Sequence, residues 1–218
     1  MNNDISEKTK NYELTVLLPA LNEEESIGRI IEEIKNVLSK KNINYCILVS
    51  DNGSSDNTIK IAKDHNVLIN HVRDKGYGSN LKTSIKDVKS KYLIFFDSDG
   101  SYDPNEIVPM YEEIKQSNID MVYGNRLIKQ EKNSMPFLNR YLGTPVLSKL
   151  ISIFFGLKVK DCNSGMRMLK LQSFEKVNFL INLLYSFKLV WHIISTSNFL
   201  VIFFLPSFPI DFNSSGDN

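Results

Sequence analysis

The sequence predicts an α/β protein with a mostly parallel sheet covered by helices on both faces. Short apolar runs alternate along the chain with longer segments that repeat apolar residues at helical spacing. The connections between them are short, and this order builds a parallel sheet with a helix after each strand. With 218 residues, 42% of them hydrophobic, the chain can bury a sizeable core. Five strands are expected.

The first expected strand is Leu14–Leu18, and an acidic turn follows it. In this turn Asn22 and Glu25 have the spacing of a capping box, which predicts the start of a helix. The turn contains no G-x-G-x-x-G sequence, and its three glutamates would repel the pyrophosphate of a dinucleotide. It therefore counts against an NAD-dependent enzyme. The helix after it carries an apolar stripe formed by Ile27, Ile30, Ile31, Ile34, Val37 and Leu38.

Cys46–Ser50 is the second expected strand, and the polar turn Asp51–Thr58 leads from it into a helix that begins near Thr58. An acidic side chain at this strand end can accept hydrogen bonds from a base or a ribose. For Ser54–Asp56, turn and helix-cap chemistry explains the residues equally well. A short third strand is expected at Val67–Asn70.

Lys75-Gly76-Tyr77-Gly78 precedes the next expected helix, which extends to about Lys89. Its glycines let the backbone approach a ligand closely, and Lys75 offers a cation for phosphate. Two glycines before a helix are also common in ordinary turns, so this stretch alone does not distinguish a ligand-binding segment from a turn.

Tyr92–Phe96 is apolar throughout, which predicts a strand buried on both faces of a parallel sheet. Asp97 and Asp99 follow it two residues apart, so their side chains should converge at the carboxyl end of the strand, where open α/β sheets bind ligands. Two adjacent carboxylates repel each other unless a cation lies between them. Oxygen ligands suit Mg²⁺ or Mn²⁺ shared with substrate phosphates. A helix-capping loop is the alternative, but it explains only Asp103.

The fifth expected strand is Asp120–Arg126, which ends in a basic loop. Arg126 is either a phosphate partner or an ordinary surface arginine. Met135–Phe155 is strongly apolar and predicts a helix, with a kink or break at Pro145. Lys158–Leu169 is expected to return toward the sheet.

Composition excludes several classes of protein. The net charge is +1, so no overall positive field recruits nucleic acid. Cys46 and Cys162 are far apart in the sequence, and they indicate neither a disulfide framework nor a zinc site. Residues 1–11 form a polar N-terminal extension without a secretory signal, which makes the cytoplasm the expected compartment.

Taken together, seven stretches resemble a family 2 glycosyltransferase with the GT-A (Rossmann-like) fold, in the branch of dolichyl- or undecaprenyl-phosphate sugar synthases. Each stretch is modest alone, but they occur in the order of the family and assign a GT-A domain to residues 12–178. The stretches are Leu18-Pro19-Ala20-Leu21-Asn22-Glu23-Glu24, Ser50-Asp51-Asn52-Gly53-Ser54-Ser55-Asp56, Lys75-Gly76-Tyr77-Gly78, Asp97-Ser98-Asp99, Gly124-Asn125-Arg126, Met135-Pro136-Phe137-Leu138-Asn139-Arg140-Tyr141-Leu142-Gly143 and Asp161-Cys162-Asn163-Ser164-Gly165-Met166-Arg167.

The resemblance implies a donor site for a nucleotide-diphosphate sugar, carried by UDP or GDP. Asp97 and Asp99 match the D-x-D pair that holds a divalent metal, Mg²⁺ or Mn²⁺, on the donor diphosphate. Ser98 would lie against the nucleotide. The nucleotide pocket would be formed by Pro19, Leu21, Glu23, Val49 and Asp51, and the phosphate contacts by Lys75, Arg126 and Arg167. The chain departs from the pattern at Asn52, where many relatives have a second Asp.

The implied reaction transfers the sugar to a polyprenyl phosphate with inversion, at the cytoplasmic face of a membrane. The metal and the basic side chains would stabilise the leaving diphosphate. A phosphate acceptor is largely ionised above about pH 6 and needs little base catalysis, whereas a sugar hydroxyl would need a base. Asp99 and, on the acceptor side, Asp161 are the candidate catalytic residues. Asp161 is alternatively a structural carboxylate that fixes the turn after it. A glycan hydroxyl acceptor and a non-catalytic nucleotide-sugar-binding fragment are the competing functions.

The resemblance stops near Asn178, and residues 179–218 form an atypical apolar tail. This tail has no acidic residue before Asp211. It is a membrane-contacting segment, a buried pair of strands or helices, or the product of a changed reading frame near residue 180. Leu189–Leu205 is shorter than the about 20 residues that span a bilayer. The abrupt loss of both family pattern and periodicity favours the changed frame, which would leave the acceptor half damaged.

Overall fold

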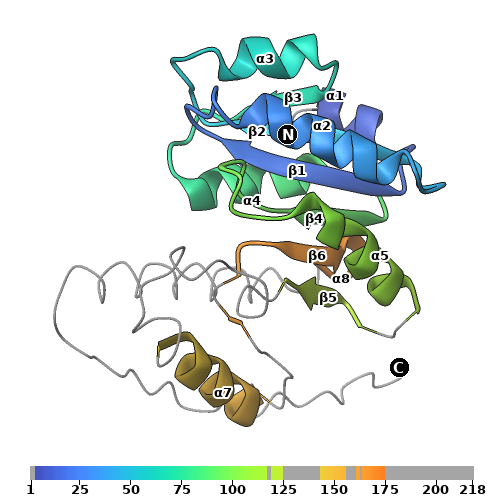
Figure 1. Ribbon diagram of the computed structural model, residues 1–218, viewed down its shortest axis with the longest axis vertical. Helices are drawn as coiled ribbons and strands as arrows, with labels where there is room; N and C mark the ends of the chain where they lie inside the picture. Colours follow the sequence, from blue (N-terminus) through green and yellow to red (C-terminus); the bar gives the residue numbers. More distant parts are fainter. Residues whose placement is uncertain (1–2, 117–118, 125–142, 156–160, 163, 175–218) are drawn as a thin grey trace, which may run out of the picture. The chain divides into compact units, whose positions relative to one another are not determined.

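The computed structural model describes residues 3–116, 119–124, 143–155, 161–162 and 164–174, all within a unit formed by residues 1–177. In these residues the strands form one sheet with the order β3-β2-β1-β4-β6-β5 (Figure 1). Their bounds are β1 Leu14–Ala20, β2 Tyr45–Asp51, β3 Leu68–His71, β4 Tyr92–Phe95, β5 Met121–Tyr123 and β6 Arg167–Lys170. The apolar tail after residue 178 lies outside the described residues, as does Arg126.

The first four strands are parallel, as the sequence predicts. β1 pairs with β2 from Leu14 opposite Tyr45 to Ala20 opposite Asp51, and with β4 from Leu14 opposite Tyr92. The sheet differs from the expectation at β6, which the sequence indicated only as a return toward the sheet. β6 is antiparallel and lies between β4 and β5. A strand that comes from the C-terminal part of the domain therefore separates two strands that are neighbours in sequence.

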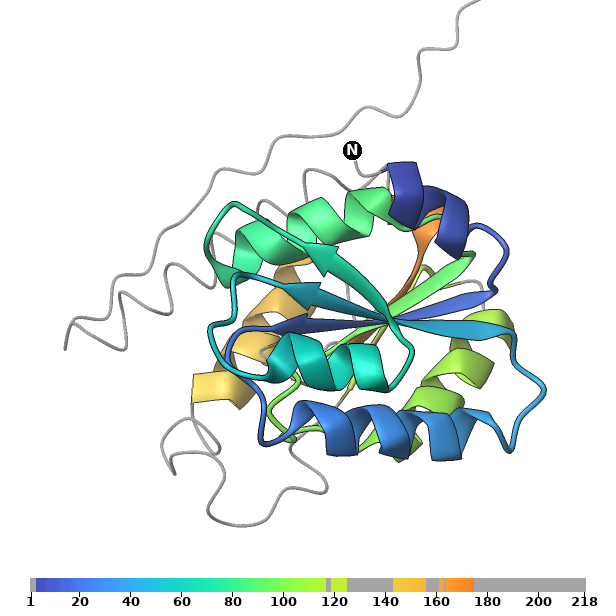
Figure 2. The same cartoon turned by 90° about the horizontal axis from the view of Figure 1, so that it is seen from above.

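Helices cover both faces of the sheet, which confirms the predicted fold class. In Figure 2, α1 and α4 lie on one face of the sheet, and α2, α3 and α5 lie on the other. The bounds of the helices are α1 Asn3–Thr9, α2 Ile27–Leu38, α3 Thr58–Asp64, α4 Tyr77–Asp87, η1 Pro104–Glu106, α5 Ile107–Gln116, α7 Thr144–Phe155 and α8 Leu171–Phe174. None of the helices in the described ranges is both long and apolar enough to cross a membrane.

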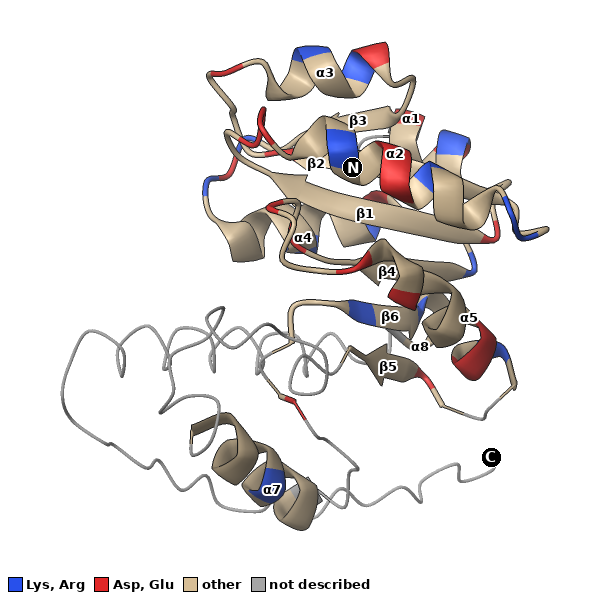
Figure 3. Ribbon diagram, in the orientation of Figure 1, with Lys and Arg blue, Asp and Glu red and all other residues tan. Residues whose placement is uncertain are grey.

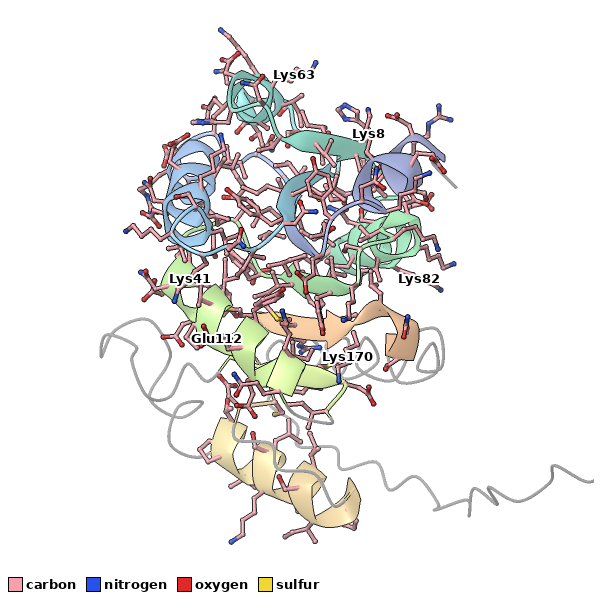
Figure 4. All side chains as sticks on the ribbon, turned by 90° about the vertical axis from the view of Figure 1, so that its right-hand side faces the viewer. Lys8, Lys41, Lys63, Lys82, Glu112 and Lys170 are labelled. Atoms are coloured by element: carbon pink, nitrogen blue, oxygen red, sulfur yellow. The ribbon has the colours of Figure 1, made fainter. Side chains whose placement is uncertain are left out.

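The core lies between the sheet and α2 and α5. The predicted stripe of α2 is buried, except that Val37 is only partly covered. Alternate residues of the central strands complete the cluster, among them Val16 of β1 and Ile94 of β4. At the surface, Lys41 after α2 and Glu112 of α5 form an ion pair of 3.9 Å, and Figure 4 shows both side chains at one edge of the molecule.

The structure confirms one predicted helix cap and contradicts another. Asp103 caps η1 as predicted, with its Oδ1 accepting from the Asn105 amide at 2.9 Å and Pro104 in the first position. The capping box of Asn22 and Glu25 is wrong. α2 begins at Ile27 after Ser26, and the Asn22 side chain instead accepts a hydrogen bond from the next loop. α7 begins at Thr144 and so places Pro145 in its first turn, whereas residues 135–142 of the expected helix lie outside the described residues.

The N-terminal residues carry a helix that packs on the domain. Ile5 of α1 is 1% exposed, and Thr9 is buried. The Thr9 hydroxyl accepts from the Lys89 amide at 3.0 Å, and the Ser6 hydroxyl donates to the carbonyl of Asp87 at 2.8 Å. These contacts tie α1 to the end of α4.

Replacing Ile5 by alanine tests whether this helix is part of the domain. Truncating a fully buried isoleucine costs about 2–5 kcal/mol, so Ile5→Ala should lower the melting temperature by several degrees. Lys8→Ala removes only an exposed ion pair with Asp4 and should change stability by less than about 1 kcal/mol. Thermal unfolding followed by circular dichroism measures both. Equal melting temperatures for Ile5→Ala and wild type would show that the domain folds without α1.

Candidate functional site

A cleft of about 330 Å³ opens where β1, β2 and β4 end and α4 begins. Of the residues that the sequence assigned to a site, it is lined by Pro19, Leu21, Glu23, Lys75, Asp97, Ser98 and Asp99. The carboxyl ends of parallel strands bring these segments together although they lie far apart in the chain. The cleft is also lined by Gly76, whose stretch was expected to let the backbone approach a ligand, and by residues to which the sequence gave no role, namely Ala20, Asn52, Gly53, Tyr77 and Asn80.

Val49 and Asp51 belong to the end of β2 but not to the lining of the cleft. Val49 is fully buried in the hydrophobic core. The Asp51 carboxylate closes its own turn, accepting from the amides of Gly53 at 3.2 Å and Ser54 at 3.0 Å and lying 3.2 Å from His71 Nδ1. Burial raises the pKa of Asp51, but the hydrogen bonds from Ser54, His71 and Gly53 outweigh it and hold this pKa below the ordinary value.

The loop after β1 is fastened to the loop after β2 by reciprocal hydrogen bonds. Asn22 donates its amide to the Ser54 hydroxyl at 3.0 Å, and its side-chain oxygen accepts from the Ser55 amide at 2.8 Å. The Glu23 amide donates to the Thr58 hydroxyl at 2.8 Å. Asn22 has a φ of 57°, the left-handed region that asparagine tolerates better than most residues. The bonds fix the backbone that carries Leu21 and Glu23 at the rim of the cleft.

Asp97 and Asp99 follow β4 in a turn, and both line the cleft as their spacing predicts. Ser98 between them is buried, and its hydroxyl donates to the Pro19 carbonyl at 2.7 Å. The Ser98 carbonyl in turn accepts from the Ser26 hydroxyl at 2.6 Å. Ser98 thus joins the turn after β4 to the end of β1, and the carboxylates on either side of it are held at the same wall.

The surroundings of Asp97 are crowded. Tyr77, at the start of α4, forms a hydrogen bond with the Asp97 carboxylate, and burial, followed by this carboxylate, raises the pKa of Tyr77 so that it stays protonated. Gly165 approaches from the other side. A Cβ atom there would lie 2.7 Å from the Tyr102 hydroxyl and 3.0 Å from Asp97 Oδ2. The Gly165 amide donates to the Tyr102 oxygen at 2.6 Å. A side chain at position 165 would therefore crowd both the Tyr102 hydroxyl and this carboxylate.

Negative charge gathers in the cleft. Figure 3 shows acidic segments in red in the loops after β1 and β4. Burial raises the pKa of Glu23, a hydrogen bond from Ser26 opposes the rise, and the charges of Asp99 and Asp97 add to it. The exposed Asp99 accepts only a backbone amide in the described contacts, that of Ser101 at 2.9 Å. Carboxylates that lie together in one cleft favour a bound cation.

The donor set fits a hard divalent ion that is shared with a phosphate ligand. Across the described residues, no group of three or more His, Cys, Asp or Glu side chains is arranged to hold a metal alone. Asp97 and Asp99 supply two carboxylates, and Mg²⁺ is commonly bound by one or two carboxylates with substrate phosphates as the other ligands. Lys75 lines the same cleft and offers a positive charge to such a phosphate.

Asp161 and Arg167 are not among the lining residues of the cleft. Asp161 is 2% exposed, and its carbonyl accepts from the Ser164 amide at 3.3 Å. Arg167 Nε donates to the Ser164 carbonyl at 3.0 Å, and its guanidinium lies over the ring of Tyr123 with 5.4 Å to the centroid. The charge of Arg167 also acts on Tyr77, which lowers that pKa slightly against the larger rise. Both residues hold the turn before β6.

The residues that the sequence missed had a weak signal. Tyr77 lies in the stretch before α4 where only Lys75 and the glycines suggest ligand binding. Asn52 was marked only as a departure from the family pattern. Asn80 carried no signal, since its position depends on α4 packing against β2, where its side-chain amide donates to the Ser50 carbonyl at 2.8 Å.

Comparison with known proteins decides the family. The Glycosyl transferase family 2 model matches residues 15–177. The chain belongs to glycosyltransferase family 2. Within curated proteins, the low-salt glycan biosynthesis hexosyltransferase of Haloferax volcanii is 32% identical over 166 residues, which is 76% of this chain and 40% of that protein. The UDP-N-acetylglucosamine–dolichyl-phosphate N-acetylglucosaminyltransferase of Methanococcus voltae is 28% identical over 175 residues, covering 70% of this chain and 67% of its own.

A solved structure agrees with the fold of this glycosyltransferase domain. It is the glucosyl-3-phosphoglycerate synthase of Mycobacterium tuberculosis in complex with Mn²⁺, UDP and glucosyl-3-phosphoglycerate, with a TM-score of 0.56 and 19% identity. The match covers 79% of this chain and 62% of the synthase. The GT-A fold expected from the sequence is thereby confirmed. The chain spans less than half the length of the Haloferax hexosyltransferase and about three fifths of the mycobacterial synthase.

The raised pKa of Glu23 predicts a pH-dependent stability. Because the folded state holds the Glu23 proton more tightly than the unfolded chain, stability falls as the pH rises from the ordinary value of 4.5 through the raised pKa. Glu23→Gln cannot ionise, so it should melt at a higher temperature than wild type at pH 7. The difference should close near pH 4.5.

The exposed neighbour Glu25 provides the control. Glu25→Gln removes the same charge from the same loop and should not reproduce the pH-dependent difference. Melting temperatures of the metal-free proteins between pH 4 and 8 give the comparison. A Glu23→Gln protein that melts at or below the wild-type temperature at pH 7 would contradict the electrostatic description of the cleft.

Proposed function

We propose that this glycosyltransferase moves a sugar from a UDP- or GDP-sugar to a polyprenyl phosphate, with a divalent metal and with inversion, at the cytoplasmic face of a membrane. The observation that carries the proposal is the convergence of Asp97 and Asp99 in one cleft with Lys75. Two relatives support the ligands. The Methanococcus enzyme is named for UDP-N-acetylglucosamine and dolichyl phosphate, and the mycobacterial synthase was crystallised with Mn²⁺ and UDP.

The residues of the chain would divide the work between binding and charge. Leu21 and Pro19 offer apolar walls at the rim, and Ser98 fixes the turn between the two carboxylates. Asp97 and Asp99 would hold Mg²⁺ or Mn²⁺, which when bound neutralises charge on the leaving diphosphate. Lys75, which lines the same cleft, would bind the diphosphate. Arg126 and Arg167 remain proposed phosphate contacts, of which Arg126 lies outside the described residues.

The acceptor side rests on chemistry more than on geometry. A polyprenyl phosphate is largely ionised above about pH 6, so its oxygen can attack without a strong base. Asp161 keeps a proposed acceptor role, although its burial and its place in the turn before β6 also suit a structural role. A hydroxyl acceptor is the second candidate function, because the Haloferax relative is named as a glycan biosynthesis hexosyltransferase.

Removing one carboxylate of the pair tests the donor site. Asp99→Ala should weaken UDP or GDP binding in the presence of Mn²⁺ by at least about tenfold, or about 1.4 kcal/mol, because the cation loses a ligand. Without metal the two proteins should bind equally weakly. Calorimetry with and without Mn²⁺ measures this, with the exposed Asp64→Ala as the control. Tight binding that is indifferent to metal would sink the assignment of Asp97 and Asp99.

The crowding at Asp97 gives a second test. Gly165→Ala places a methyl group against Asp97 Oδ2 and the Tyr102 hydroxyl, so it should also reduce metal-supported nucleotide binding by about tenfold or more. Adding Tyr102→Phe removes the closer obstacle and should restore part of the affinity. If Gly165→Ala alone binds as wild type does, Asp97 is not held in the position that the cleft requires.

Turnover then separates the candidate functions. Radiolabelled UDP- and GDP-sugars are offered with dolichyl or undecaprenyl phosphate, and in parallel with a glycan acceptor. Product only on the lipid phosphate supports the proposal, and product on the glycan supports the second candidate. Nucleotide-sugar binding without product on either acceptor indicates a binding fragment with a damaged acceptor half.

A further inference from the structure

Asn52 makes three side-chain hydrogen bonds to the main chain of one segment that borders the cleft. Its Nδ2 donates to the carbonyls of Val72 at 3.2 Å and Asp74 at 2.8 Å. Its Oδ1 accepts from the amide of Gly76 at 2.8 Å. The partners fix the orientation of the side-chain amide, because carbonyls only accept and an N–H group only donates. One side chain at the end of β2 therefore holds the main chain of residues 72–76 at three points.

The segment that Asn52 holds has little support from regular structure. It lies between β3 and α4, and Arg73 to Gly76 are exposed. Gly76 has a φ of 109°, which side-chain-bearing residues rarely adopt. Lys75 and Gly76 nevertheless form one wall of the cleft. A segment without a helix or strand keeps one conformation only where its polar groups are bonded to something fixed.

Asn52 also faces the cleft, yet its amide donors are already used. The side chain is buried, with 6% of the residue exposed. Both hydrogens of Nδ2 are directed to carbonyl oxygens, so neither is left for a bound nucleotide. These hydrogen bonds suit a residue that holds other residues in position.

We propose that Asn52 is a positioning residue, which holds the wall formed by Lys75 and Gly76 in the conformation that binds the diphosphate of the donor. The inference rests on the proposed donor-binding function. It adds an explanation of how this wall is formed before the ligand binds. Fixing a lysine-bearing segment before the ligand arrives removes the cost of ordering it during binding. Asn52 thus acts on the ligand through Lys75.

Asn52→Asp is the sharpest substitution, because it changes one NH₂ group to an oxygen. The acceptor for the Gly76 amide remains. The two donations are lost, and a negative oxygen lies against the carbonyls of Val72 and Asp74 at about the distances that now join them. The segment should detach from the end of β2 while the core below it is untouched.

The test combines binding with loop mobility. Asn52→Asp should weaken UDP or GDP binding in the presence of Mn²⁺ by about tenfold and should raise the KM for the nucleotide-sugar more than it lowers kcat. Hydrogen exchange should accelerate in residues 72–78 of the ligand-free protein and not in the sheet. Asn44→Asp is the matched control, because the Asn44 amide also donates to a carbonyl, that of Asn11 at 2.8 Å, at the opposite end of β2. It should change neither measurement.

A double-mutant cycle with Lys75→Ala decides whether the effect passes through Lys75. If it does, adding Asn52→Asp to Lys75→Ala costs little further affinity. Fully additive losses, wild-type affinity in Asn52→Asp, or unchanged exchange of residues 72–78 would each overturn the inference. A wild-type protein that binds neither nucleotide counts against the proposed function instead, and the exchange measurement still decides whether Asn52 holds the segment.

Discussion

The cleft depends on one constraint, namely that loops without regular structure must satisfy their main-chain polar groups by bonding to one another. β1, β2 and β4 are parallel and end at the same edge of the sheet, so their loops meet there. Asn22 joins the first loop to the second, Ser98 joins the fourth strand to the first, and Asn52 joins the second strand to the segment before α4. The walls of the cleft are therefore bonded into a single frame.

That frame makes it feasible to hold several carboxylates close together. Burial is the main cause of the raised pKa of Glu23, and repulsion from Asp99 and Asp97 adds to it. Flexible loops would relieve such repulsion by moving apart. Backbone anchors on both sides prevent this, so the electrostatic strain remains available to attract a cation. A region with this charge would repel a bare diphosphate, which is why the proposed donor site needs both a metal and the cation of Lys75.

The sequence was informative where the signal is local. The apolar run Tyr92–Phe96 predicts a strand, and Asp97 and Asp99 after it predict a convergent pair of carboxylates. Neither prediction needs knowledge of contacts elsewhere in the chain, because in extended backbone alternate side chains point to the same side. The capping box of Asn22 failed because its side chain has a partner in the next loop, which spacing along the chain does not reveal. The antiparallel β6 was missed for a similar reason. Its short run Arg167–Lys170 becomes a strand only between β4 and β5, which supply its pairing partners.

The two aspartates of the pair also differ in this way, because one has partners remote in sequence and the other has a local partner. Asp97 is hydrogen-bonded to Tyr77 and lies beside Gly165, and these two residues come from segments remote from it in sequence. Asp99 is exposed and bonded to the neighbouring Ser101 amide. The spacing in the sequence makes the two residues look equivalent, but the structure places them in different environments. In the proposed site Asp97 would offer a metal an oxygen that Tyr77 already holds in place, whereas Asp99 would offer an oxygen that is open to solvent.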